Sequence, residues 1–222
     1  MPAASTASEM ELSGKKAVEL VFAALSRHGL LLKQDKAIPS VVGLVTGESL
    51  RTSWWSHPKS HLIFSVLTRL ADDPRVLLVK LLDRKDTIVH STLWPALLAV
   101  GSAREQWQTQ GLSNSAADLL KRIDRGNTEV RSSGVVAKEL QLRLLATAHE
   151  VHTDSGRHEL LLESWPAWSD RVGCKPLKSS ADGRQILEQA TIGLGAPLKA
   201  LPWPARSKAS DRPRLRHGKG EL

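Results

Sequence analysis

The sequence predicts an α+β fold that is mainly helical and contains one β-hairpin. Apolar residues recur at helical spacing in several segments, each bounded by a capping residue, a glycine or a proline. Residues 75–90 differ, because two runs rich in Val, Leu and Ile flank the polar turn 83–86, a pattern typical of a hairpin. The 222 residues suffice for one large domain or two small ones.

The first 90 residues predict three helices followed by this hairpin. The helices are expected at about 15–28, 39–45 and 58–72. The third has an apolar stripe through Leu62, Val66 and Leu70, begins at Pro58 and ends before the Asp72-Asp73-Pro74 sequence.

The rest of the chain is predicted to be helical. Helices are expected at about 93–100, 114–125, 135–151, 156–172 and 181–191, with another turn or two between 102 and 110. Pro166 is expected to kink or interrupt the fourth of these. The chain therefore divides into a disordered lead-in (1–12), a first domain (13–101), a helical domain (102–196) and a basic disordered tail (197–222).

Composition favours a cytoplasmic protein. The single cysteine, Cys174, excludes an internal disulfide framework and fits a reducing compartment. No window of about 18 apolar residues is present, so no membrane partner is expected. The first ten residues lack the basic start and apolar run of a secretory signal. Phosphate-loop, dinucleotide-binding and cysteine-knuckle motifs are missing, so no cofactor is expected and a non-enzymatic role is favoured.

The net charge of +8 is concentrated near the C-terminus. From Lys199 onward the sequence contains seven Lys and Arg residues and two acidic residues, which gives that segment a net charge of +5. Such a segment can contact phosphates without reading sequence, or it can be a solvated end. Candidate phosphate contacts in it are Arg212, Arg214 and Arg216.

The order helix, helix, helix, hairpin resembles that of winged-helix domains, in which the third helix enters the major groove of DNA and the hairpin flanks it. The resemblance implies that the helix at 58–72 presents polar and basic residues to DNA, namely Lys59, Ser60, Ser65, Thr68 and Arg69. It also implies that Arg84 and Lys85 at the hairpin tip reach a phosphate or the minor groove. Asp72, Asp73, Asp83 and Asp86 lie close to these basic residues and would repel a polyanion.

The most unusual local sequence is Ser53-Trp54-Trp55-Ser56-His57-Pro58. If a helix begins at Pro58, His57 lies at its N-terminus, where backbone N–H groups favour anions. Arg51, Lys59 and His61 would add donors, and either Trp54 or Trp55 could stack on a base. The structural alternative is that the Trp pair anchors a loop on the core while His57 satisfies a backbone group.

Four segments are similar to a family of uncharacterised bacterial proteins, and this resemblance implies no activity. They are 43–47, 53–58, the sequence Leu93-Trp94-Pro95-Ala96-Leu97-Leu98-Ala99-Val100, and 152–158.

His149, His152, Asp154 and His158 form the densest set of potential metal ligands. On a helix His149 and His152 would share a face, and a third ligand could complete a site open to water. The alternative is a helix end whose histidines favour the helix dipole. The same residues could also act as general acid and base.

Gln106-Trp107-Gln108 superficially resembles the paired-glutamine motif of winged-helix DNA glycosylases that excise alkylated bases. That resemblance implies only a remote glycosylase-like possibility, and a surface helix is the simpler interpretation. The predicted functions are therefore, in order, a DNA-binding protein, an adaptor using exposed Trp residues, and a small-molecule enzyme using His57 or the histidine cluster.

Overall fold

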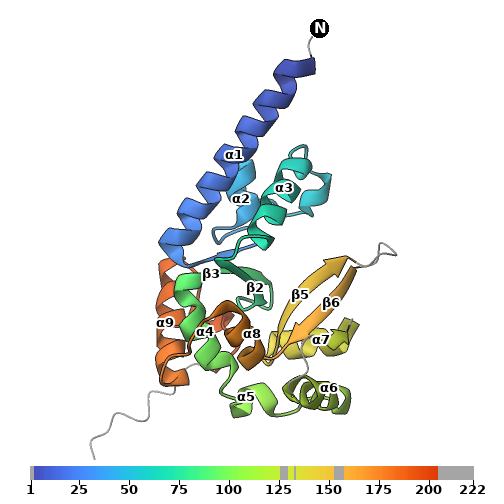
Figure 1. Cartoon of the computed structure of the whole chain (residues 1–222). Helices are drawn as coiled ribbons and strands as arrows, with labels where there is room; N and C mark the ends of the chain where they lie inside the picture. Colours follow the sequence, from blue (N-terminus) through green and yellow to red (C-terminus); the bar gives the residue numbers. More distant parts are fainter. Residues whose placement is uncertain (1–2, 126–129, 133, 153–157, 205–222) are drawn as a thin grey trace, which may run out of the picture.

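The computed structural model describes residues 3–125, 130–132, 134–152 and 158–204. The α+β prediction is confirmed: helices surround two three-stranded antiparallel sheets in the described part of the chain (Figure 1). Among the described helices, none combines the length and the apolar character needed to cross a membrane.

The first half follows the predicted order with one added strand. Its elements are α1 (Ala3–His28), β1 (Leu30–Leu32), α2 (Val41–Thr46), α3 (Ser60–Ala71), β2 (Val76–Lys80) and β3 (Asp86–His90). Helix α1 begins at Ala3, so it continues through residues expected as a lead-in. Strand β1, which the sequence did not predict, is fully buried and pairs with β3, giving the strand order β1-β3-β2.

The second half contains a sheet where two long helices were expected. Its elements are η2 (Ser91–Leu93), α4 (Trp94–Gly101), α5 (Gln106–Thr109), α6 (Asn114–Asp124), β4 (Val130–Ser132), α7 (Gly134–Leu142), β5 (Thr147–His152), β6 (His158–Glu163), α8 (Trp165–Val172), α9 (Ser180–Gly193) and η3 (Leu198–Ala200). The strand order is β4-β6-β5, so the last strand is central in both sheets.

The predictions of helices over 135–151 and 156–172 are therefore wrong. Helix α7 ends at Leu142, and β5 and β6 pair antiparallel from Thr147 opposite Glu163. Pro166 lies in the first turn of α8, where its missing N–H costs nothing, so it marks a helix start instead of a kink. The Ser164 hydroxyl caps this start by accepting from the Ala167 N–H at 3.2 Å.

Two hydrophobic cores hold these elements. The larger core combines α1–α4 and the first sheet with α8, α9 and the segment up to Trp203. The smaller core lies among α6, α7 and the second sheet, around Ile123, Leu140 and Leu162. Residues expected to form one helical domain (102–196) thus contribute to both cores. Residues 197–204, expected as part of the tail, reach the larger core through the buried Leu201 and Trp203.

Candidate nucleic-acid interface

Helix α3 presents one face to solvent. Ile63, Val66 and Leu70 are buried, and the helix packs against α1, α2 and β2. Residues on the opposite side of the helix, which recur every three or four positions, are exposed. Figure 1 shows α3 on the side of the molecule away from α4 and α9. The exposed positions are His61, Phe64, Ser65, Thr68 and Arg69.

The two adjacent tryptophans have different environments. They lie in the short helix η1 (Trp54–Ser56), where Trp54 is 5% exposed and Trp55 is 63% exposed. Their rings stack with centroids 4.0 Å apart, so the exposed ring of Trp55 packs on the buried ring of Trp54. The exposed Phe64 ring of α3 lies 6.0 Å from Trp55. Trp55 and Phe64 together form an exposed aromatic pair beside the polar positions of α3.

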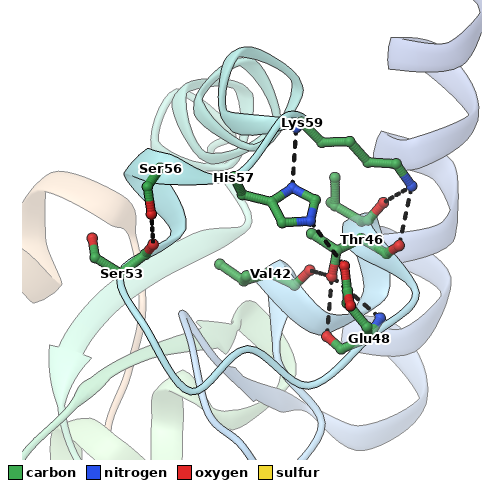
Figure 2. Close-up of polar contacts among 8 residues, drawn as sticks. Val42, Thr46, Glu48, Ser53, Ser56, His57 and Lys59 are labelled. Carbon is green, nitrogen blue, oxygen red and sulfur yellow. Dashed lines mark hydrogen bonds and ion pairs between the residues drawn. The ribbon is translucent and has the colours of Figure 1, made fainter.

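His57 joins the loop to the start of α3 (Figure 2). Its Nδ1 accepts the backbone N–H of Lys59 at 3.0 Å, and its Nε2 lies 2.9 Å from Glu48 Oε1. Because Nδ1 accepts a hydrogen bond, Nε2 carries the proton and donates to the carboxylate. Both ring nitrogens are used, so His57 has no donor left for the anion contact expected from the sequence. Its interactions match the structural alternative.

Lys59 is also engaged within the fold. Its ammonium donates to the carbonyl oxygens of Thr46 at 3.0 Å and Val45 at 3.4 Å, at the C-terminus of α2 (Figure 2). A cation there stabilises the negative end of the helix dipole. Lys59 therefore couples α2 to α3, whereas the sequence predicted a nucleic-acid contact.

The hairpin tip is docked on the rest of the molecule. The Lys85 N–H donates to the Leu82 carbonyl at 2.8 Å around Asp83 and Arg84, whose φ angles of 49° and 59° match a type I′ turn. The Asp83 N–H donates to the Ala200 carbonyl at 2.7 Å. A tip tethered to η3 is not arranged like the projecting wing that the sequence predicted.

Lys85 at this tip forms an ion pair with the buried carboxylate of Asp35, at 2.6 Å. Burial raises the pKa of Asp35, but hydrogen bonds from Lys85 and from two backbone N–H groups outweigh burial and hold that pKa below its ordinary value. Lys85 therefore stabilises the loop after β1. Arg84 is exposed and lines a pocket beside η3.

Of the other predicted contacts, Arg51 is exposed in the loop before η1. The tail arginines Arg212, Arg214 and Arg216 lie outside the described residues.

The histidine cluster does not take the expected form. His149 and His152 belong to β5, so the helical face on which a metal site was expected is replaced by a strand. His158 begins β6, and Asp154 lies outside the described residues, as do the side chains of His152 and His158. Among the side chains that the structure describes, no group of three or more His, Cys, Asp or Glu is placed to hold a metal ion.

Gln108 of the glutamine motif is fully buried and makes structural hydrogen bonds. Its amide nitrogen donates to the carbonyls of Arg143 at 3.2 Å and of Gly101 and Leu144 at 3.4 Å, while its Oε1 accepts the Glu105 N–H at 2.9 Å. A glutamine that positions an attacking water needs access to solvent or substrate. Gln108 has neither, because its polar atoms are already paired inside the fold.

Comparisons of this chain with protein-family models, with curated proteins and with solved structures found no match.

Proposed function

We propose that this chain binds duplex DNA, with α3 as the helix that enters the major groove. The observation that carries the proposal is the solvent-facing stripe of α3 within a unit ordered α1-β1-α2-α3-β2-β3. That order, with the strand order β1-β3-β2, resembles winged-helix domains, in which the equivalent helix reads base edges.

The chemistry of the stripe suits base contacts. Ser65 and Thr68 offer hydroxyl groups that donate and accept, and Arg69 can donate to guanine or to a phosphate. Phe64 can pack on a thymine methyl group. Trp55, supported from below by Trp54, supplies a rigid apolar surface at the edge of the same face.

The proposed interface is smaller than the one predicted from sequence. His57, Lys59 and Lys85 are used in folding and are left out of it. Asp72, which is exposed at the C-terminal end of α3, limits the positive potential there. Most of the nonspecific phosphate attraction must then come from the basic segment 205–222, which has a net charge of +4.

The test measures fluorescence anisotropy of labelled random-sequence duplex DNA over a range of salt concentrations. On random-sequence DNA Arg69 acts as a phosphate contact, so Arg69→Ala is expected to weaken binding to all sequences and to lower its salt dependence. Lys121→Ala is the matched control, since this exposed lysine lies on α6 at the other core. Deleting 205–222 should weaken binding to all sequences and reduce its salt dependence. No binding at low salt, or equal effects of the two point variants, would refute the proposal.

The exposed aromatic pair favours a second candidate function, a protein adaptor anchored by Trp55. Of the seven Trp residues, five are buried and Trp107 is half-buried, so only Trp55 is available as an anchor. An adaptor that used several Trp anchors is thereby disfavoured. The adaptor hypothesis predicts no duplex binding in the anisotropy experiment, which separates it from the first proposal.

A further inference from the structure

A basic pocket lies between the hairpin tip and the elements α5, α7 and η3. Its volume is about 570 Å³, within the range of about 300–1,000 Å³ that is usual for small-molecule sites. None of its lining residues belongs to α3. The pocket is therefore separate from the proposed DNA-binding face.

Positive charge predominates in the lining. The lining contains two carboxylates and four cationic side chains, those of Lys80, Arg84, Arg143 and Lys199. Among the four cations, Lys80 forms an ion pair at 2.5 Å with Asp86, a residue outside the lining. For the other three cations, no carboxylate of the described residues lies within ion-pair distance.

The two lining carboxylates do not cancel this charge. Glu139 accepts the Ser113 hydroxyl at 2.7 Å and the Ser113 N–H at 3.0 Å; these bonds, and to a smaller extent the charge of Arg143, hold its pKa below the ordinary value. Asp83 is the second carboxylate, at the hairpin turn. The lining therefore keeps a net charge of +2, although Glu139 interacts with the charge of Arg143.

Arg143 is held in place by uncharged partners. Its guanidinium donates to the carbonyl oxygens of Gln108 at 3.2 Å, Gln110 at 2.6 Å and Gly111 at 3.3 Å. Carbonyl oxygens orient the group without neutralising its charge. A fixed cation of this kind needs little reorganisation to bind an anion.

Arg84 occupies a backbone position at which glycine would be less strained. Its φ angle of 59° falls in the second central position of the type I′ turn, which is usually glycine. A long basic side chain at a left-handed position is a local strain of the kind that concentrates at functional sites. The turn is also hydrogen-bonded to η3 through the Asp83 N–H and the Ala200 carbonyl, so Arg84 and Lys199 lie on two segments that are joined to each other.

Trp107 supplies an aromatic wall. Its indole N–H donates to Glu105 at 2.9 Å, and its ring packs 6.0 Å from that of Trp203. The ring is half-buried and lines the same pocket as the cations. An aromatic surface beside several cations is suited to a planar group that carries phosphates.

We propose that this pocket binds a nucleoside diphosphate or triphosphate. Arg84, Arg143 and Lys199 contact the phosphates, and the base packs against Trp107. The proposal does not depend on the DNA-binding function, because the two sites share no residue.

Isothermal titration calorimetry of the full chain with ADP tests this site. Arg84→Gly and Lys199→Ala are each expected to reduce ADP affinity about tenfold or more. Arg84→Gly suits the left-handed turn and should therefore keep the fold. Lys121→Ala is the distant charge control and should bind ADP as the unaltered chain does. Trp107→Phe should weaken the binding of ADP more than the binding of inorganic pyrophosphate, because pyrophosphate has no base to pack against the ring.

Three results would overturn the proposal. They are the absence of ADP binding at millimolar concentration, unchanged affinity in both charge variants, and complete displacement of ADP by a short DNA duplex. The last result would place the phosphates on the DNA-binding surface. Because duplex binding is measured separately, failure of this proposal can be distinguished from failure of the proposed DNA-binding function.

Discussion

At the scale of single residues, His57 illustrates how a group that looks reactive in sequence serves the fold. Its two ring nitrogens connect Glu48 to the backbone of Lys59. The bond to Lys59 satisfies an N–H group at the start of α3 that lacks a partner within the helix.

We expect His57→Ala to lower the free energy of unfolding by about 1–2 kcal/mol, as loss of a helix cap does. Urea denaturation followed by circular dichroism measures this change. His61→Ala is the matched control, because His61 is exposed on α3 and its loss should change stability by less than about 0.5 kcal/mol. If His57→Ala reduced DNA affinity at full stability, the structural role would be wrong.

Other details at this scale are not readable from the sequence. The sequence marks the Trp54–Trp55 pair as unusual, but which ring is buried depends on the packing of η1 against the larger core. Phe64 was not predicted as an interface residue, although it lies off the apolar stripe of its helix, and that position was the available signal. Arg143 and Lys199 were missed because residues 84, 143 and 199 meet only through the tertiary fold.

At the scale of elements, α4 and α9 cross at a point where only glycine fits. A Cβ atom at Gly183 would lie 2.6 Å from the Ala96 carbonyl oxygen and 3.1 Å from Val100 Cγ2. The backbones of the two helices thus approach closely and exclude any side chain at this position.

We expect Gly183→Ala to destabilise the protein by about 1–3 kcal/mol, because the added methyl forces the two helices apart. Gly193→Ala is the control on the same helix, where a Cβ would meet nothing within 4 Å. It should be neutral or stabilising by up to about 1 kcal/mol, since alanine favours helix. Thermal unfolding of both variants gives the comparison, and equal melting temperatures would contradict it.

Elements with a clear local pattern were predicted well, and those defined by distant partners were not. Helix α3 is predictable from the helical spacing of its apolar residues, and the β2–β3 hairpin from two apolar runs around a polar turn. Both signals lie in one short stretch of the sequence. Strand β1 is three leucines long and exists because β3 pairs with it. Strand β6 contains one short apolar run, Leu160-Leu161-Leu162, which suits a helix or a strand equally, and β5 contains none. The pairing of β5 with β6 decides in favour of strands.

At the scale of the whole molecule, the segment after α9 closes the larger core. Ala200, Leu201 and Trp203 are buried, and the Trp203 indole N–H donates to Glu188 at 3.0 Å. The Ala200 carbonyl also accepts the N–H of Asp83, so this segment is bonded to the hairpin.

We expect truncation after Ala196 to lower the free energy of unfolding by about 3 kcal/mol or more, because it removes a buried Trp and a buried Leu. Truncation after Pro204 is the matched control and should change stability by less than about 0.5 kcal/mol, since it spares these residues. Chemical denaturation of the two shortened chains measures the difference. Equal stabilities would show that 197–204 contributes nothing to the core.

The same closure has a consequence for synthesis. Helices α1–α4 share their core with Trp165, Trp168, Leu187 and Trp203, which are synthesised after them. A nascent chain in which only α1–α4 have emerged from the ribosome therefore presents an unfinished apolar surface, and these helices cannot complete folding as an early unit. Folding of this protein should finish only after its C-terminal helices have left the ribosome, so the growing chain passes through a stage in which it needs protection from aggregation.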